Sequence, residues 1–143
     1  MPLVAIVAVM SLLLASPAAA SEPSGVITGQ LMYPSDYIPE DLTVCAESIG
    51  DGTALCTAEQ LQDELRRTIY RLELPPGDYH VYAKLTDQAS FSDAYGPDYR
   101  AYYSEFVTCG LLASCTSHAP IVVRVDAGAT VDSIDPTDWY DFD

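Results

Sequence analysis

The residues of this chain with the widest range of chemistry are two histidines and four cysteines. An imidazole can act as a general base or bind a metal, and both uses need partner side chains that converge on one point. His80 and His118 lie far apart in the sequence and share no short ligand spacing. Ser117 precedes His118, but the partners of a catalytic triad meet through folding, so this adjacency does not predict a hydrolase. We expect His80 on the solvent side of a strand and His118 in a loop.

The cysteines predict two disulfides, because none of their spacings is the short Cys-x-x-Cys pair expected of a zinc site. Cys45 and Cys56 flank a strong turn signal between Ser48 and Thr53. A hairpin with a four-residue loop makes these cysteines a non-hydrogen-bonded pair, with Cα atoms roughly 4.5 Å apart. That separation suits a disulfide. Cys109 and Cys115 would then close a small loop, and a zinc site is the alternative.

The carboxylates are the third group that could do chemistry. There are 21 acidic residues against 6 basic ones, for a net charge of -15, which disfavours binding to nucleic acid or anionic lipid. Asp87, Asp93 and Asp98 share one loop, and further aspartates crowd the C-terminus. Calcium takes six to eight oxygen ligands, so these aspartates are weak calcium candidates. A solvated acidic face is the favoured interpretation, and we expect no cofactor.

Aromatic side chains supply the candidate binding surface. Tyrosine and tryptophan combine an apolar ring with a polar group, and they serve at interfaces and can stack on sugars. The expected surface joins the loop from Phe91 to Tyr103 with the tail from Trp139. Its members are Tyr95, Tyr99, Tyr102, Tyr103, Trp139 and Tyr140. The alternative is that some of these rings cover the edge of the core.

The elements that must position these residues are predicted to be strands. From Tyr70 to Leu74 and from Tyr79 to Leu85, apolar and polar residues alternate, which is typical of half-buried strands. Pro75-Pro76-Gly77-Asp78 predicts a type II turn between them, with a positive φ at Gly77. We therefore expect a hairpin here, with Tyr79 packed in the core.

Further strands are expected over 25–33, 42–47, 53–58, 121–125 and 130–134, with Leu55 inward beside Ala46. Residues 59–68 have weak helical character and predict at most one helical turn or a polar loop. Residues 100–108 fit a strand or a short helix equally well. Together, these elements predict an all-β fold, a seven-stranded antiparallel Greek-key sandwich with at most one short helix.

The first twenty residues predict a secretory signal peptide. They hold no charged side chain, an apolar run from Leu3 to Leu14, and small residues before a polar segment. Residues 21–143 would then form one β-sandwich domain with an acidic aromatic tail, secreted or periplasmic and without stable membrane insertion. A retained membrane anchor is the alternative.

The motif Leu74-Pro75-Pro76-Gly77-Asp78-Tyr79-His80-Val81 resembles the Leu-x-Pro-Gly-x-Tyr-x-Val signature of carboxypeptidase regulatory-like domains. Residues 25–29 and 123–131 fit the same pattern. The resemblance implies a transthyretin-like (prealbumin-like) sandwich and an accessory or stalk module without catalysis. The chain lacks the Tyr-Arg-Gly-Ser ending of the related hydroxyisourate hydrolases and the His-x-x-Glu zinc motif of the associated peptidases.

The resulting expectation is an exported, non-catalytic binding or structural accessory module, with an envelope protein or a glycan as partner. One alternative is a metal-dependent enzyme of the non-haem iron oxygenase type. Intradiol dioxygenases have a related sandwich and bind iron through two tyrosines and two histidines, but their histidines lie close together. Another alternative is a structural subunit of an envelope assembly.

Overall fold

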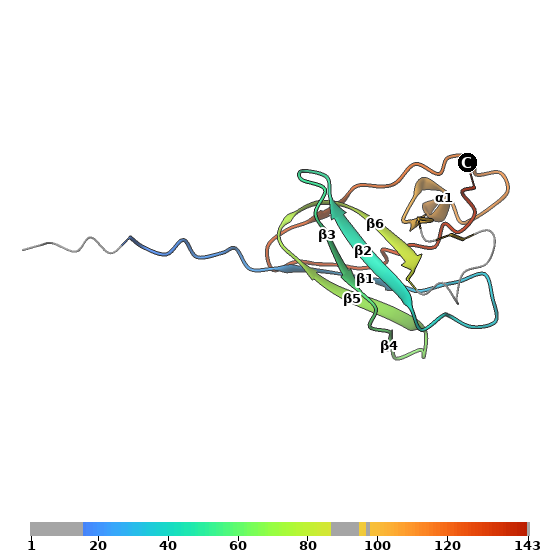
Figure 1. Ribbon diagram of the computed structural model, residues 1–143, viewed down its shortest axis with the longest axis horizontal. Helices are drawn as coiled ribbons and strands as arrows, with labels where there is room; N and C mark the ends of the chain where they lie inside the picture. Colours follow the sequence, from blue (N-terminus) through green and yellow to red (C-terminus); the bar gives the residue numbers. More distant parts are fainter. Residues whose placement is uncertain (1–15, 87–94, 97, 143) are drawn as a thin grey trace, which may run out of the picture.

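The computed structural model describes residues 16–86, 95–96 and 98–142, and it places most of them around two facing sheets (Figure 1). Sheet A has the order β4 (Leu61–Gln62), β5 (Thr68–Leu74), β1 (Gly25–Gln30) and β9 (Thr130–Val131). Sheet B has the order β3 (Ala54–Thr57), β2 (Leu42–Ser48), β6 (Gly77–Leu85) and β7 (Ala101–Tyr102), and β8 (Val123–Val125) also pairs with β6. Among the strands of the described residues, only β1 and β9 pair in parallel. The only helix in the described residues is α1 (Glu105–Thr108).

The all-β prediction is therefore confirmed, and the predicted faces of the central strands are correct. The core between the sheets takes alternate residues of β5 and β6, because successive side chains of a strand point to opposite faces. Its members include Ile27, Val44, Ala46, Tyr70, Leu72, Leu74, Tyr79, Val81, Ala83 and Leu85. The described residues form nine strands, three of which have only two residues.

The predicted hairpin between residues 70 and 85 is wrong. β5 pairs with β1 and β6 pairs with β2, so the two strands belong to opposite sheets. Pro75 and Pro76 have no backbone N–H to donate to a ladder, and they turn the chain from one sheet to the other. The hydroxyl of Tyr79 donates to the carbonyl oxygen of Pro75 at 2.6 Å and fixes this corner. Gly77 is not among the glycines with positive φ, so the type II turn is also wrong.

Of the two structures expected for residues 59–68, the helical turn does not form, and most of the stretch is loop and turn at the edge of sheet A. This stretch forms β4 and the turn into β5. Leu65 is exposed, so the two leucines make no buried helical face. One carboxylate oxygen of Asp63 accepts the backbone N–H groups of Leu65 and Arg67, and Arg66 takes a positive φ of 61°. In residues 100–108 both expected elements occur, because β7 is followed by α1.

Both predicted disulfides are present. Cys45 and Cys56 are directly opposite in the β2–β3 hairpin, with Cα atoms 4.1 Å apart, and Cys109 joins Cys115. Leu55 lies opposite Ala46 as expected, but it is 41 % exposed at the open edge of sheet B rather than buried.

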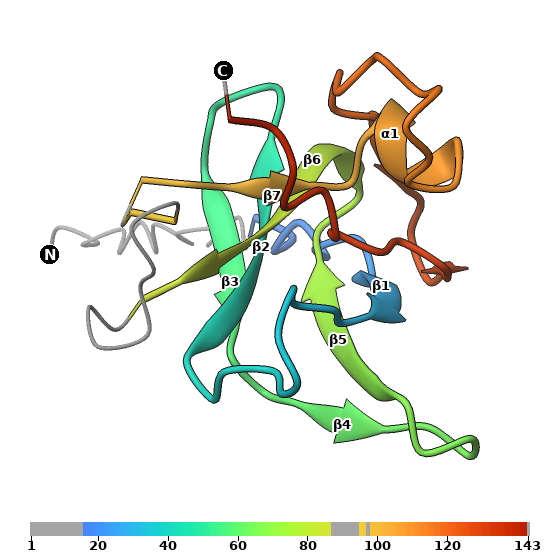
Figure 2. The same ribbon diagram turned by 90° about the vertical axis from the view of Figure 1, so that its right-hand side faces the viewer.

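The C-terminal segment is built into the fold instead of forming a separate tail. It passes beside β7, where the backbone N–H of Asp138 donates to Tyr102 (Figure 2). Trp139 is buried in the core, and its indole N–H donates to the carbonyl oxygen of Met32 at 2.8 Å. These contacts close one end of the space between the sheets.

Candidate functional site

The predicted aromatic surface is divided between several environments. Tyr95 and Tyr99 pack against the buried ring of Trp139, with centroids 5.2 and 6.0 Å away. Phe142 contacts both tyrosines at 5.9 Å and is 60 % exposed, so it covers this aromatic cluster from outside. Trp139 itself is inaccessible to a partner in this structure.

The other predicted members lie elsewhere. Tyr102 is on the outer face of sheet B, 5.4 Å from the ring of Tyr82 and 6.4 Å from His80. Tyr103 packs against the core, whereas Tyr140 is exposed beside Phe106.

A polar cluster that the sequence did not predict consists of Ser104, His118 and Asp138. Asp138 is only 1 % exposed. One of its carboxylate oxygens accepts the Ser104 hydroxyl at 2.5 Å and lies 2.8 Å from Nδ1 of His118. Phe106 stacks on the His118 ring at 4.5 Å. Three segments far apart in the chain therefore meet on one buried carboxylate.

These three residue types occur in hydrolase triads, but their geometry differs. In a triad the serine donates to the histidine, which then accepts the serine proton. Here Ser104 is fully buried and donates to Asp138, so both partners compete for the same carboxylate oxygen. The cluster therefore ties the C-terminal segment to the rest of the fold and presents no nucleophile.

The candidate metal ligands do not converge in the part of the chain that the structure describes. No group of three or more His, Cys, Asp or Glu side chains there could hold a metal ion. His80 lies beside Tyr102, and His118 beside Asp138. Of the calcium candidates, Asp98 is exposed, and Asp87 and Asp93 lie outside the described residues.

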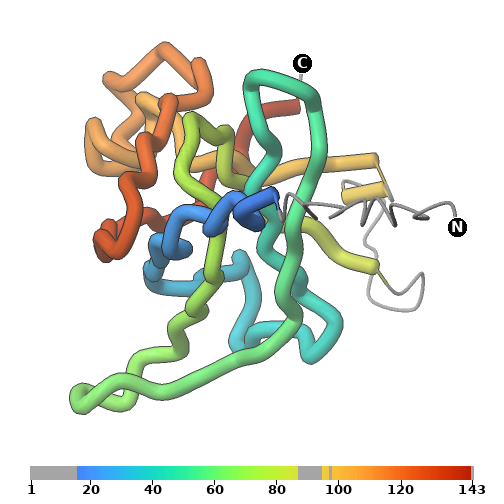
Figure 3. The backbone as a smooth tube through the Cα atoms, turned by 90° about the vertical axis from the view of Figure 1, so that its left-hand side faces the viewer, coloured from blue at the N-terminus to red at the C-terminus, as the bar shows by residue number. Residues whose placement is uncertain are grey.

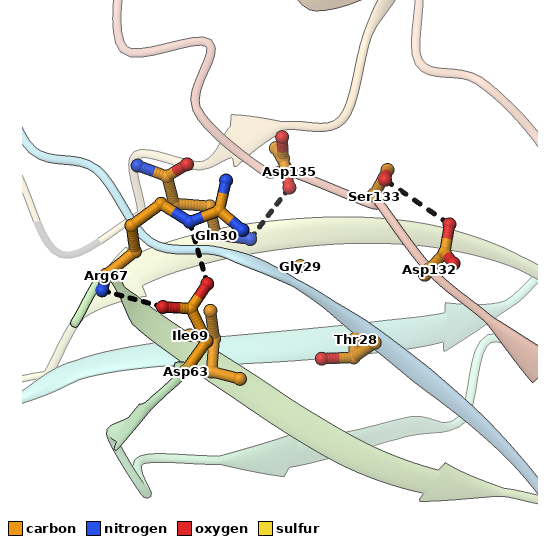
Figure 4. A pocket seen from close by; sticks show the side chains of 9 residues that line it. All are labelled: Thr28, Gly29, Gln30, Asp63, Arg67, Ile69, Asp132, Ser133 and Asp135. Atoms are coloured by element: carbon orange, nitrogen blue, oxygen red, sulfur yellow. Dashed lines mark hydrogen bonds and ion pairs between the residues drawn. The ribbon is translucent and has the colours of Figure 1, made fainter. Parts of the chain in front are cut away.

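A cleft with a volume of about 290 Å³ lies on the outer side of sheet A. Its floor is β1, one wall is the β4–β5 turn, and the other is the segment after β9 (Figure 4). The lining residues are Thr28, Gly29, Gln30, Asp63, Arg67, Ile69, Asp132, Ser133 and Asp135. We call this the sheet A cleft.

The charged side chains of the sheet A cleft are held in place by hydrogen bonds. Nε of Arg67 donates to Asp63 at 2.7 Å, and the terminal guanidinium nitrogens point toward Gln30 and Asp135 (Figure 4). The backbone N–H of Arg67 and its side chain lower the pKa of Asp63, which keeps this carboxylate ionised. Asp135 accepts the backbone N–H of Gln30 at 2.7 Å and so caps the edge of β1 where β9 has ended.

The wall formed by residues 132–135 passes very close to β1. The backbone N–H of Ile134 donates to the carbonyl oxygen of Thr28 at 3.1 Å, and a Cβ atom on Gly29 would overlap the Ile134 carbonyl. Only glycine fits at this crossing. Ser133 takes a positive φ of 58°, an uncommon conformation for a residue with a side chain.

Comparisons with known proteins identify no relative: no family model matches, and neither a curated protein nor a solved structure matches the chain. The two disulfides indicate an oxidising, extracellular environment, because such bridges persist there and are rare in the cytosol. Among the residues placed by the structure, no helix has the length and apolar character needed to span a bilayer.

Proposed function

We propose that the chain is an exported, non-catalytic β-sandwich module that binds the hydroxyl groups of a glycan in the sheet A cleft. The observation that carries this proposal is the mixed lining of the cleft, which places an arginine beside carboxylates and a hydroxyl. The guanidinium of Arg67 offers donors and Asp132 and Asp135 offer acceptors, while the Ser133 hydroxyl donates to Asp132 and can accept through its oxygen. Sugar hydroxyls both donate and accept, so they match such a mixed lining, whereas a simple ion would match only one part of it.

The resemblance to carboxypeptidase regulatory-like domains supports an accessory role. Its signature falls at the corner between β5 and β6, where Leu74, Tyr79 and Val81 are buried. Motif residues with this placement serve the scaffold, so the ligand must be recognised elsewhere. The sheet A cleft is formed by other residues and is a suitable place for that recognition.

The test is titration of the isotope-labelled protein with a panel of neutral oligosaccharides, followed by NMR. Binding in the sheet A cleft should shift the backbone amides of Gly29, Gln30 and Ser133. Arg67→Ala should weaken binding about tenfold, the effect expected for loss of charge-assisted hydrogen bonds. Arg124→Ala is the matched control, because Arg124 is also an exposed, ion-paired arginine but lies on β8 of the other sheet.

The proposal fails if no oligosaccharide shifts these amides, or if Arg67→Ala and Arg124→Ala weaken binding equally. Elemental analysis of the purified protein tests the non-catalytic part. Stoichiometric iron would favour an oxygenase instead.

A further inference from the structure

β3 forms one edge of sheet B, and it is open to solvent. Three of its four residues are exposed and the fourth is half-buried. Figure 3 shows the β2–β3 hairpin standing along one side of the fold. β2 pairs with one side of β3, and among the described residues no strand pairs with the other side.

The register identifies the backbone groups that face outward. The backbone N–H of Ser48 donates to the carbonyl oxygen of Thr53 at 2.9 Å, so these two residues form a hydrogen-bonded pair at the end of the hairpin. Pairs alternate along an antiparallel ladder, which makes Cys45–Cys56 and Glu47–Ala54 non-hydrogen-bonded pairs. The N–H and C=O groups of Ala54 and Cys56 therefore point away from β2, toward the free edge.

This edge is cross-linked to its neighbouring strand, and although it is short it carries no charged residue and no proline. The Cys45–Cys56 disulfide joins β3 covalently to the neighbouring strand. A carboxylate oxygen of Asp51 accepts the N–H of Thr53 and orders the turn. Natural edge strands are commonly protected by charged residues, proline or bulges, and the sequence Ala-Leu-Cys-Thr of β3 contains no charge and no proline.

A groove of mixed polarity lies next to this edge. It has a volume of about 240 Å³, and Leu55 of β3 with Pro75, Pro76 and Tyr79 of the β5–β6 corner form its apolar part, whereas Ser48, Asp51 and Thr53 of the β2–β3 turn form its polar part. The register places Val81, Ala46 and Leu55 in one row across the inner face of sheet B. A strand added beyond β3 would continue this row and cover the exposed side chain of Leu55.

We propose that β3 binds an extended, basic segment of a partner protein by strand addition. The outward groups of Ala54 and Cys56 would pair with the backbone of this segment, and one of its apolar side chains would lie in the groove over Leu55. This mode takes affinity from main-chain hydrogen bonds and specificity from alternate side chains. Charge complementarity selects the partner, because Asp51 lines the groove and the whole chain has a net charge of -15. A second copy carries the same excess of acids, which opposes self-pairing.

The probe is a capped heptapeptide, Lys-Thr-Val-Thr-Val-Thr-Lys, added to the full-length secreted protein. We expect binding to slow hydrogen exchange at the amides of Ala54 and Cys56. Ala54→Pro removes one outward N–H but no bond to β2, so the hairpin should be kept. It should weaken binding about tenfold, whereas Ala54→Thr, which keeps the N–H, should change it less than about twofold.

A second probe protects the test against misfolding of the proline variant. The same peptide is N-methylated at the positions that face β3, or at the positions that face away. Only the first form should fail to bind. Equal binding of both forms, or of a peptide with glutamate in place of lysine, would overturn the proposal.

Self-association is the remaining alternative occupant. Concentration-dependent dimerisation that Ala54→Pro abolishes would show that a second copy occupies the edge, and would also overturn the proposal. Arg67→Ala should leave peptide binding unchanged, so this result is separate from that for the sheet A cleft.

Discussion

Replacing Asp138 by alanine should destabilise the protein more than replacing any exposed aspartate. The carboxylate of Asp138 is buried and accepts hydrogen bonds from Ser104 and from the backbone N–H of Tyr140, and Nδ1 of His118 lies 2.8 Å away. Alanine removes the acceptor but leaves its partners in place. A buried donor without a partner costs more than the hydrogen bond gained when it is paired.

The magnitude follows from the burial of each partner. Ser104 is fully buried, so its unpaired hydroxyl costs about 1–3 kcal/mol. The side chain of His118 is 26 % exposed and can form a hydrogen bond to water instead, so losing its contact with Asp138 costs about 0.5–1.5 kcal/mol. The sum is about 3 kcal/mol. For a domain of this size that lowers the midpoint of thermal unfolding by roughly 10 °C.

The assay is urea unfolding at pH 7, with Asp132→Ala as the control because Asp132 is exposed on the same segment. Ser104→Ala and the double variant complete a double-mutant cycle. We expect the double variant to be more stable than the two single losses predict, by about 1–2 kcal/mol, because the buried Ser104 hydroxyl is then no longer left without its acceptor. If Asp138→Ala and Asp132→Ala unfold within about 0.5 kcal/mol of each other, the buried network does not stabilise the fold as described.

Three further perturbations test other parts of the structure. Burial raises the pKa of Tyr70 above its ordinary value, so the contribution of Tyr70 to stability should be constant below about pH 10 and fall above it, as the unfolded tyrosine ionises. Urea unfolding between pH 9 and 12 should show a shallower fall for Tyr70→Phe. Gly29→Ala should cost about 1–3 kcal/mol in urea unfolding, because its Cβ meets backbone, while Gly50→Ala meets nothing closer than 3.7 Å and should cost under about 1 kcal/mol. Alkylation and mass spectrometry at rising dithiothreitol should show the Cys109–Cys115 bridge opening before Cys45–Cys56: each bridge joins an exposed to a buried cysteine, but Cys45 and Cys56 are also held by the β2–β3 ladder, whereas Cys109 and Cys115 lie outside the strands.

The sequence predicted those features that depend on local pattern. Alternation with a period of two assigns a face to each residue of a strand, and the buried residues Tyr70, Leu72, Val81 and Ala83 follow it. The position of the turn between Ser48 and Thr53 fixed the register of the β2–β3 hairpin, and with it the cysteine pairing. Each of these predictions needs only residues close together in the chain.

Strand pairing could not be predicted in the same way. The alternating residues on either side of Pro75 and Pro76 are compatible with two structures, a hairpin within one sheet and a corner between two sheets. The pairing of β1 with β5 decides between these two structures, and β1 lies about 40 residues earlier in the chain than β5. The same difficulty applies to residues 59–68. Two leucines among good helix formers indicate a weak helix. In the structure, the turn held by Asp63 and the pairing with β5 replace that helix.

The candidate sites were harder still to predict, because distant segments create them. Asp138 meets Ser104 and His118 across separations of 34 and 20 residues. No spacing rule links these positions, and the one local hint is an aspartate placed directly before a tryptophan. The sheet A cleft likewise takes its walls from residues near 30, 67 and 135.

One segment joins the sheet A cleft to the core, so the shape of the cleft and the stability of the fold depend on the same contacts. The Ile134 carbonyl accepts the hydroxyl of Tyr70 at 2.7 Å inside the sandwich, and the next residue, Asp135, caps β1 at the cleft. Four residues later Trp139 fills the core. The cleft wall cannot move without disturbing the buried Tyr70 and Trp139, since packed interiors resist such shifts. This explains how a small domain can hold charged cleft residues in fixed positions, and why an engineered change of its ligand should begin at the β4–β5 turn, which carries no buried anchor.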